Sequence, residues 1–218
     1  MRLRAQHEVA RFAVLSRMGL AESMGPNRWR VRRDFDQILR AMQRTSDRQR
    51  TLAAHGALAS DERLPMEVLD LRHVTSVEGR VLVHGQEEQS GRSYLMLEGT
   101  DAKVYFISYS REMEEARSRG ELRTNSFVRL RKLSLGGTPM IEVNDLGDAE
   151  RLLTNRGHLG EIAREFLKRG IMPTEAGWGG WLGKYQAALC KTAREIEVGK
   201  ERNLVRSQQR KRDRSVGR

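Results

Sequence analysis

The five histidines are the side chains of this sequence best suited to bind a transition metal or to carry a proton near neutral pH. They stand far apart along the chain, at His7, His55, His73, His84 and His158. No two have the short spacing that places both imidazoles on one ion, as in an HExxH helix. The sequence therefore predicts no metal site, and we expect no other cofactor.

The local motifs of nucleophilic catalysis and of nucleotide binding are also missing. No serine lies in a GxSxG turn, and no GxxxxGK[S/T] loop occurs. The glycines between Gly177 and Gly183 lack the preceding strand that a dinucleotide site needs. Tyr94 and Tyr105 fall at expected strand positions, where packing accounts for them. We predict that the chain is not an enzyme, with no catalytic residue to assign.

Basic side chains are the chemistry that the sequence does offer. Lysine and arginine number 40 against 29 acidic residues, which gives a net charge of +11 and a pI near 10.5. Residues 1–60 carry a net charge of +7, residues 61–148 carry −4 and residues 149–218 carry +8. Such an excess favours a polyanionic partner, nucleic acid before an anionic membrane, with contacts concentrated at the two ends.

Cysteine content and hydropathy indicate the compartment. The single cysteine, Cys190, excludes an intrachain disulfide and a cysteine-rich zinc cluster. No apolar run approaches the length of a membrane span, and no signal-peptide pattern opens the chain. We expect a cytoplasmic protein without membrane insertion.

The N-terminal region predicts a helix followed by a basic hairpin. Residues 4–20 have helical apolar periodicity, and a turn at Gly25-Pro26-Asn27 separates two short strands. This order is typical of the end of a winged helix-turn-helix, whose helix enters a DNA groove while the hairpin contacts phosphates. An ordinary helix and hairpin with solvated arginines is the alternative. A complete winged module needs about two more helices before this one, so we expect a piece of a longer protein.

The middle of the chain predicts a helix and then short strands. Residues 34–55 form a helix with Ile38, Leu39, Met42 and Leu52 as core candidates, and residues 56–65 form a linker. Strands follow at 77–83, 93–97, 103–107, 127–133 and 140–143, with a helical insert at 112–119. Short antiparallel strands with glycine corners favour a small closed or partly open barrel of oligonucleotide-binding or SH3-like type. Alternation along 127–132 buries Val128 and Leu130 and places Arg129 and Arg131 on the other face, where solvation is the alternative use.

The C-terminal region predicts helices and a basic tail. Helices are expected at 148–153, 158–170 and 184–198, and Trp178 and Trp181 are expected to pack against them. The tail from Gly199 to Arg218 has almost no apolar residues, so we expect disorder. Its two candidate uses are a tether for phosphates and an address read by a secretion coupling protein, and a solvated charged end without a role is the alternative.

Together these patterns predict an α+β chain in four parts. They are a truncated winged-helix-like end with its helix (1–56), a barrel-like domain (66–146), a helical region (147–198) and the disordered tail (199–218). The candidate DNA-binding residues are all basic: Arg4, Arg11, Arg28, Arg30, Arg32, Arg33, Arg129, Arg131, Arg210, Lys211, Arg212 and Arg214.

The order of several short motifs resembles a known bacterial domain. Met18-Gly19-Leu20-Ala21-Glu22 with Gly25-Pro26-Asn27-Arg28-Trp29-Arg30-Val31 is similar to its "GLAE…G…RWRL" segment. Residues 40–52 resemble its following helix, 77–85 its "G-R-V-x-x-x-G" strand and 93–107 its "hYLxxxGxDGxxHYV" hairpin. This domain of unknown function lies downstream of the nuclease in TraI-type conjugative relaxases. The resemblance covers roughly residues 10–190, and the order of the motifs carries it.

The resemblance implies a role in plasmid mobilisation, with a relaxase nuclease domain and a type IV secretion coupling protein as partners. The catalytic tyrosine and the metal-binding histidines of such relaxases belong to an upstream domain, so none is carried over. Residues 44–49 depart from the "RGDII…M" segment of the resembled domain. Two other classes stay open: an independent nucleic-acid-binding regulator, and a protein-interaction adaptor whose charge serves solubility.

Overall fold

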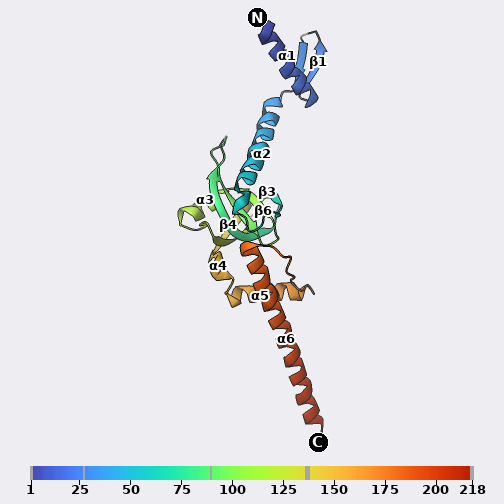
Figure 1. The fold of residues 1–218 in the computed structure, drawn as a ribbon, viewed down its shortest axis with the longest axis vertical. Coiled ribbons are helices and arrows are strands. Elements are labelled where there is room, and N and C mark those ends of the chain that lie inside the picture. The colour runs from blue at the N-terminus through green and yellow to red at the C-terminus, as the bar shows by residue number, and fades with distance from the viewer. Residues whose placement is uncertain (1, 27, 89, 136–137, 217–218) are drawn as a thin grey trace. The chain divides into compact units, whose positions relative to one another are not determined.

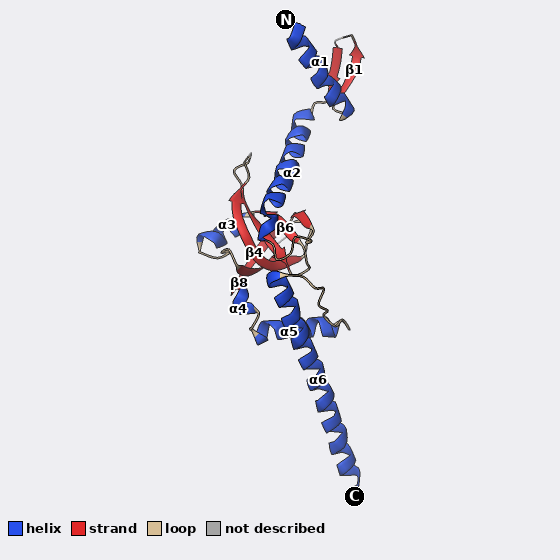
Figure 2. Cartoon of the chain, viewed as in Figure 1, coloured by secondary structure: helices blue, strands red, loops and turns tan. Residues whose placement is uncertain are grey.

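The computed structural model of the chain describes residues 2–26, 28–88, 90–135 and 138–216 (Figure 1). The chain divides into two compact units, Met1–Arg48 and Gln49–Arg218, with helix α2 (Phe35–His55) running through the boundary. The class is α+β, as predicted, with helices and strands in both units (Figure 2).

The first unit contains the predicted helix and hairpin. Helix α1 (Arg2–Arg17) is followed by β1 (Ala21–Gly25) and β2 (Arg28–Val31), which pair antiparallel. Gly19, at a φ of +71°, takes the left-handed conformation that ends the helix. The Phe12 ring of α1 stacks on the Trp29 ring of β2, with centroids 5.6 Å apart and planes 10° apart. Asn27, which we placed in the turn, lies outside the described residues.

Helix α2 contributes less to the core than its apolar pattern predicted. Leu52, near its C-terminal end, is buried, whereas Met42 is 49% exposed. Ile38 and Leu39 are half-buried. The prediction of a core role for Met42 was wrong, because only the last turns of α2 join the larger core.

Six strands of the second unit form one mixed sheet. They are β3 (Met66–Leu69), β4 (Ser76–Gln86), β5 (Ser93–Gly99), β6 (Val104–Ser108), β7 (Ser126–Leu135) and β8 (Thr138–Asp148). Their order is β3-β6-β5-β4-β7-β8, and only the β3–β6 pair is parallel. The strands described pair as an open sheet, whose edge strands β3 and β8 do not meet, rather than as the closed barrel that was one form of our prediction.

Both faces of the sheet are covered, which explains why β5 is buried along most of its length. On one face, Tyr94 and Met96 pack with helices α4 (Ala149–Leu152), α5 (Arg156–Lys168) and α6 (Gly180–Val216). On the other face, Leu95 and Leu97 pack with α3 (Arg111–Ser118). The sheet and the C-terminal helices therefore share one core, although the sequence suggested separate parts at 66–146 and 147–198.

The predicted linker, residues 56–65, is packed rather than loose. It contains the short helix η1 (Gly56–Leu58), and Leu64 is buried in the core shared with α6. Ser60 donates from its backbone nitrogen and its hydroxyl to the Glu98 carboxylate, which is fully buried. The same hydroxyl oxygen accepts from the backbone nitrogen of Leu182 at 3.1 Å, in the first turn of α6.

Glu98 is also the carboxylate of a buried ion pair. Arg80 Nη2 lies 2.9 Å from Glu98 Oε2, and its guanidinium lies over the Trp181 ring at 5.6 Å. The Trp181 indole donates to the Ala149 carbonyl oxygen at 2.9 Å. The predicted packing of Trp181 against neighbouring helices is thereby confirmed.

The last helix extends beyond Val198, where we expected it to end. Helix α6 continues to Val216, so the prediction of disorder from Gly199 was wrong for the backbone. No glycine or proline occurs between Lys200 and Val216, and most residues there are good helix formers. The side chains of Arg210, Lys211, Arg212 and Arg214 lie outside the described part. Among the helices that the structure describes, none combines the length and apolar character needed to cross a membrane.

We expect Glu98→Ala to lower the free energy of unfolding by about 3 kcal/mol, because it leaves the Arg80 guanidinium buried without its carboxylate. Glu67→Ala is the matched control, since it removes a carboxylate from an exposed pair with Lys103. That control should cost at most about 1 kcal/mol. Urea unfolding of both variants is the measurement, and equal losses would contradict a special role for Glu98.

Candidate functional site

Positive charge is concentrated in the first unit. Residues 1–48 contain eleven arginines and five acidic residues, for a net charge of +6. A charge of this size on a unit with so few residues creates a field that attracts polyanions.

Strand β2 presents two of these arginines on one face. Along β2 the side chains alternate, with Arg28 and Arg30 exposed and Trp29 and Val31 half-buried. The stack of Trp29 on Phe12 fixes the inner face, so the two arginines point to the opposite side of the hairpin. Arg30 lies 3.8 Å from Glu22, an exposed pair that contributes little to holding it. We call Arg28 and Arg30 the hairpin arginines.

The other candidates of this unit are placed differently. Arg32 makes a bidentate contact with Asp34, at 2.9 and 2.7 Å, so its charge is already compensated. The same contact holds the pKa of the Asp34 carboxyl below its usual value. Arg33 and Arg11 are exposed, whereas the side chain of Arg4 lies outside the described part.

Arg129 and Arg131 belong to the second unit and line a groove. As predicted, Val128 and Leu130 are fully buried, and the two arginines lie on the opposite face of β7. Arg129 donates from Nε to Glu78 Oε2 at 2.8 Å and is half-buried, while Arg131 is exposed. These two candidates are therefore adjacent to each other, and sequence alternation was sufficient to find them.

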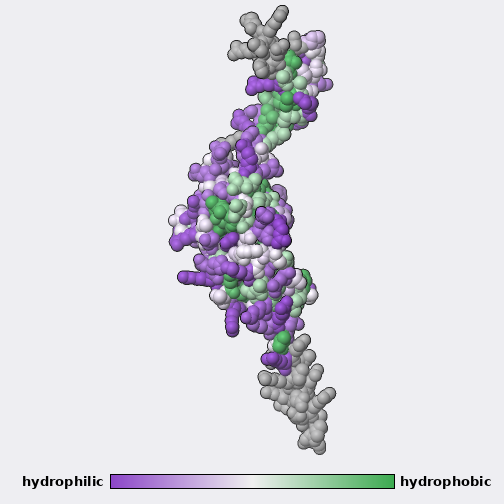
Figure 3. All heavy atoms as spheres, in the orientation of Figure 1, coloured by the Kyte–Doolittle hydropathy of each residue, from purple (hydrophilic) through white to green (hydrophobic). Residues whose placement is uncertain are grey.

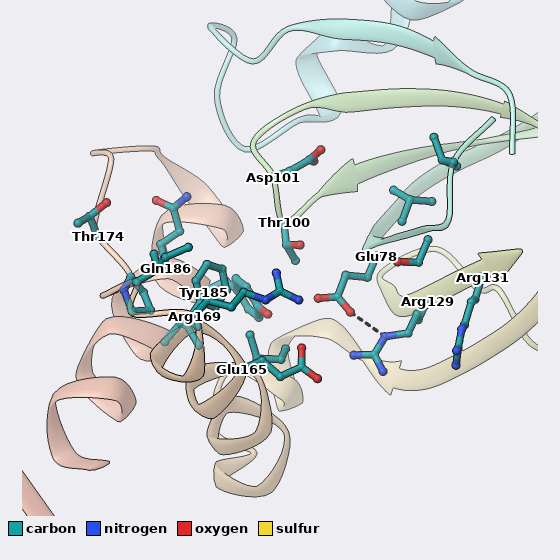
Figure 4. Close-up of a pocket in the computed structure, with 18 of the residues that line it drawn as sticks. Glu78, Thr100, Asp101, Arg129, Arg131, Glu165, Arg169, Thr174, Tyr185 and Gln186 are labelled. Atoms are coloured by element: carbon teal, nitrogen blue, oxygen red, sulfur yellow. Dashed lines mark hydrogen bonds and ion pairs between the residues drawn. The ribbon is translucent and has the colours of Figure 1, made fainter. Parts of the chain in front are cut away.

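The groove has a volume of about 900 Å³ and lies between the sheet and the C-terminal helices (Figure 4). One wall comes from β4 and β7, and the other comes from α5, from α6 and from residues 171–174. We call it the β7 groove. Its ionisable groups are Glu78, Asp101, Tyr105, Arg129, Arg131, Glu165, Arg169 and Tyr185.

Two polar side chains close to this groove lack a partner. Tyr185 lines the groove, and its buried hydroxyl has no hydrogen bond to the described residues, although the residue is only 2% exposed. Burial raises the pKa of this hydroxyl, so it stays protonated. His158 Nε2 is also buried and unpaired within the described part of the chain, and its ring meets the Phe127 ring edge-on with centroids 5.4 Å apart.

The histidine side chains that the structure describes do not converge on an ion. No group of three histidine, cysteine, aspartate or glutamate side chains among the described residues is arranged to hold a metal. His84 Nδ1 instead lies 2.6 Å from the Tyr109 hydroxyl, which occupies one of its ring nitrogens.

The comparison with protein families adds one finding. A family described as "Protein of unknown function (DUF3363)" matches residues 8–134, which is more than half of the chain. The chain belongs to this family. The match begins within α1 and ends in β7, so it includes the hairpin arginines and most of the sheet. No curated protein and no solved structure matches the chain.

The half-buried ring of His158 predicts a loss of stability in mild acid. Burial lowers its pKa below the ordinary value of 6.5, so the folded protein keeps the ring neutral while the unfolded chain takes up a proton. The melting temperature should therefore fall as the pH drops below about 6.5.

Thermal melts of two variants isolate this effect. His158→Gln should reduce the fall, and a remainder is expected because burial also lowers the pKa of His84. His73→Gln removes an exposed imidazole whose contact with Asp70, at 3.7 Å, contributes little, so its profile should stay close to that of the parent. Identical pH profiles for the parent and His158→Gln would show that this ring does not set the acid limit.

Proposed function

We propose that this protein binds DNA without catalysing a reaction on it, and that the hairpin arginines contact the phosphates. The observation that carries the proposal is the exposed face of β2, where Arg28 and Arg30 stand together on a unit with a net charge of +6. Guanidinium groups suit phosphate oxygens in charge and geometry.

The hairpin fits the role of a wing, with α1 as the groove-entering helix of a winged helix-turn-helix. The sequence order of α1, β1 and β2 supports this, as does the Phe12–Trp29 stack that fixes the hairpin against the helix. Phosphate contacts position a protein without reading bases, so we expect weak sequence preference and steep salt dependence.

The resemblance to a domain of TraI-type relaxases supports a place for this activity. In this proposal the chain works in the cytoplasm beside a relaxase nuclease domain and holds DNA near the origin of transfer. The basic C-terminal part of α6 would then be available to a type IV secretion coupling protein. An independent regulator would bind DNA in the same way, and the identity of the DNA bound in cells separates these two roles.

Replacing both hairpin arginines, as Arg28→Gln with Arg30→Gln, should weaken binding to a short duplex, because two phosphate contacts are lost. The slope of log affinity against log salt should shrink by about two. Fluorescence anisotropy between about 50 and 200 mM salt measures both quantities.

The control removes the same charge elsewhere. Arg111→Gln with Arg119→Gln acts on exposed arginines at the two ends of α3, each paired with a glutamate. This variant should keep the parent's salt slope. If both double variants weaken binding equally, net charge and not the hairpin controls affinity.

Trp29→Ala should act through structure instead of charge. Because the indole is half-buried, we expect a loss of about 2 kcal/mol, below the roughly 3–5 kcal/mol of a fully buried tryptophan. Hydrogen exchange of residues 9–48 is the measurement, since the melting of the second unit would hide the change. Unchanged protection of β1 and β2 would show that the Phe12–Trp29 stack does not hold the hairpin.

A further inference from the structure

The β7 groove combines features that the proposed DNA contact does not use. All of its lining residues belong to the second unit, so it is separate in the chain from the hairpin arginines. Figure 4 shows carboxylates and guanidinium groups from the sheet and from the helices pointing into the same space.

The unpaired Tyr185 hydroxyl is the first feature that points to a ligand. Buried hydroxyls are nearly always hydrogen-bonded, because an unmade bond costs about 1–3 kcal/mol. The nearby Glu78 carboxylate accepts from Arg129 Nε, and the Tyr185 hydroxyl bonds to neither residue of this pair. A molecule in the groove could supply the missing partner to Tyr185.

The charges of the groove point to a ligand with few charges. Three arginines, Arg129, Arg131 and Arg169, are balanced by three carboxylates, which are Glu78, Asp101 and Glu165. A polyphosphate chain would be attracted by the arginines, but repulsion from the carboxylates would offset this attraction. A ligand with one carboxylate can contact exposed Arg131 and the terminal nitrogens of Arg129 with less of this repulsion, because it carries a single negative charge.

The helical wall adds an apolar surface. Phe166, Ile171 and Met172 line the groove and are 36%, 49% and 43% exposed. Gly170, at a φ of +72°, ends α5 and turns the chain so that Ile171 and Met172 follow directly beside Phe166. Large apolar side chains gathered at a groove are typical of a binding surface.

We propose that the β7 groove binds an extended peptide segment of a partner protein, with a carboxylate beside a bulky apolar side chain. The carboxylate contacts Arg131 and Arg129, the apolar side chain covers Ile171 and Met172, and a backbone carbonyl accepts from Tyr185. This proposal does not rest on DNA binding by residues 1–48.

Selection from a phage-displayed library of short random peptides, with the full chain as target, tests the proposal. The enriched peptides should share an acidic residue next to leucine, isoleucine or phenylalanine. Their affinity should fall about tenfold for Arg131→Glu, which loses a charge-assisted contact. Ile171→Ser and Tyr185→Phe should each weaken binding. The same peptide with its acidic residue replaced by asparagine or glutamine should bind poorly to the parent protein.

The matched control is Arg156→Glu, which reverses an exposed charge in the first turn of α5, outside the groove. It should leave peptide affinity unchanged. Peptides without the acidic–apolar pair, or with equal losses for Arg131→Glu and Arg156→Glu, would overturn the proposal. So would a labelled oligothymidylate whose binding depends on Arg131 while no peptide is enriched, since the groove would then bind single-stranded nucleic acid. Duplex binding by the hairpin arginines is unaffected by either result.

Discussion

The second unit depends on a single buried carboxylate. Glu98 would cost several kcal/mol to bury alone, and its position is sustained by Arg80 and by both donors of Ser60. Through Ser60 it is linked to the first turn of α6, whose backbone nitrogens carry partial positive charge and favour a nearby anion. One side chain thus connects the segment before the sheet, the centre of the sheet and the helix that covers it. The indole of Trp181, below the Arg80 guanidinium, shields this network from water.

The two units differ in how their charged side chains are held and balanced. In the first, Leu20 and Ala21 are the buried apolar residues described, so one aromatic stack has to orient an exposed basic face. In the second, a sheet covered on both faces holds balanced charges in a groove. Figure 3 shows the result, with hydrophilic side chains over much of the visible surface and apolar patches between them. Salt should strongly weaken contacts made by the exposed basic face of the first unit. It should weaken contacts in the groove of the second unit less, because partly buried groups are screened less.

Local patterns in the sequence were sufficient for local structure. The Gly25-Pro26 turn and the alternation along residues 127–132 predicted the hairpin and the face of Arg129 and Arg131, and both are found. The packing of residues 56–65 was not predicted, because small polar residues are typical of a linker. The contact that holds them, between Ser60 and Glu98, joins residues 38 positions apart in the sequence. Tyr185 was missed for the same reason, since its neighbours Glu78 and Arg129 come from distant strands. The tail was misjudged because low apolar content argues against packing but not against a helix.

The covering of the sheet by helices from the C-terminal part of the chain has a practical consequence for the design of fragments. The DUF3363 match ends at residue 134, before β8 and before α4, α5 and α6, which cover the Phe127 face of the sheet together with the end of α2. A polypeptide cut at that limit would lose the His158, Trp181 and Tyr185 rings that pack on Phe127, and would free the outer edge of β7 for pairing with other chains. Such a fragment should aggregate, whereas expression through at least Ala193, the last buried residue of α6 in the core, retains every layer. The limits of the sequence family and the limits of the folding unit are therefore different in this protein.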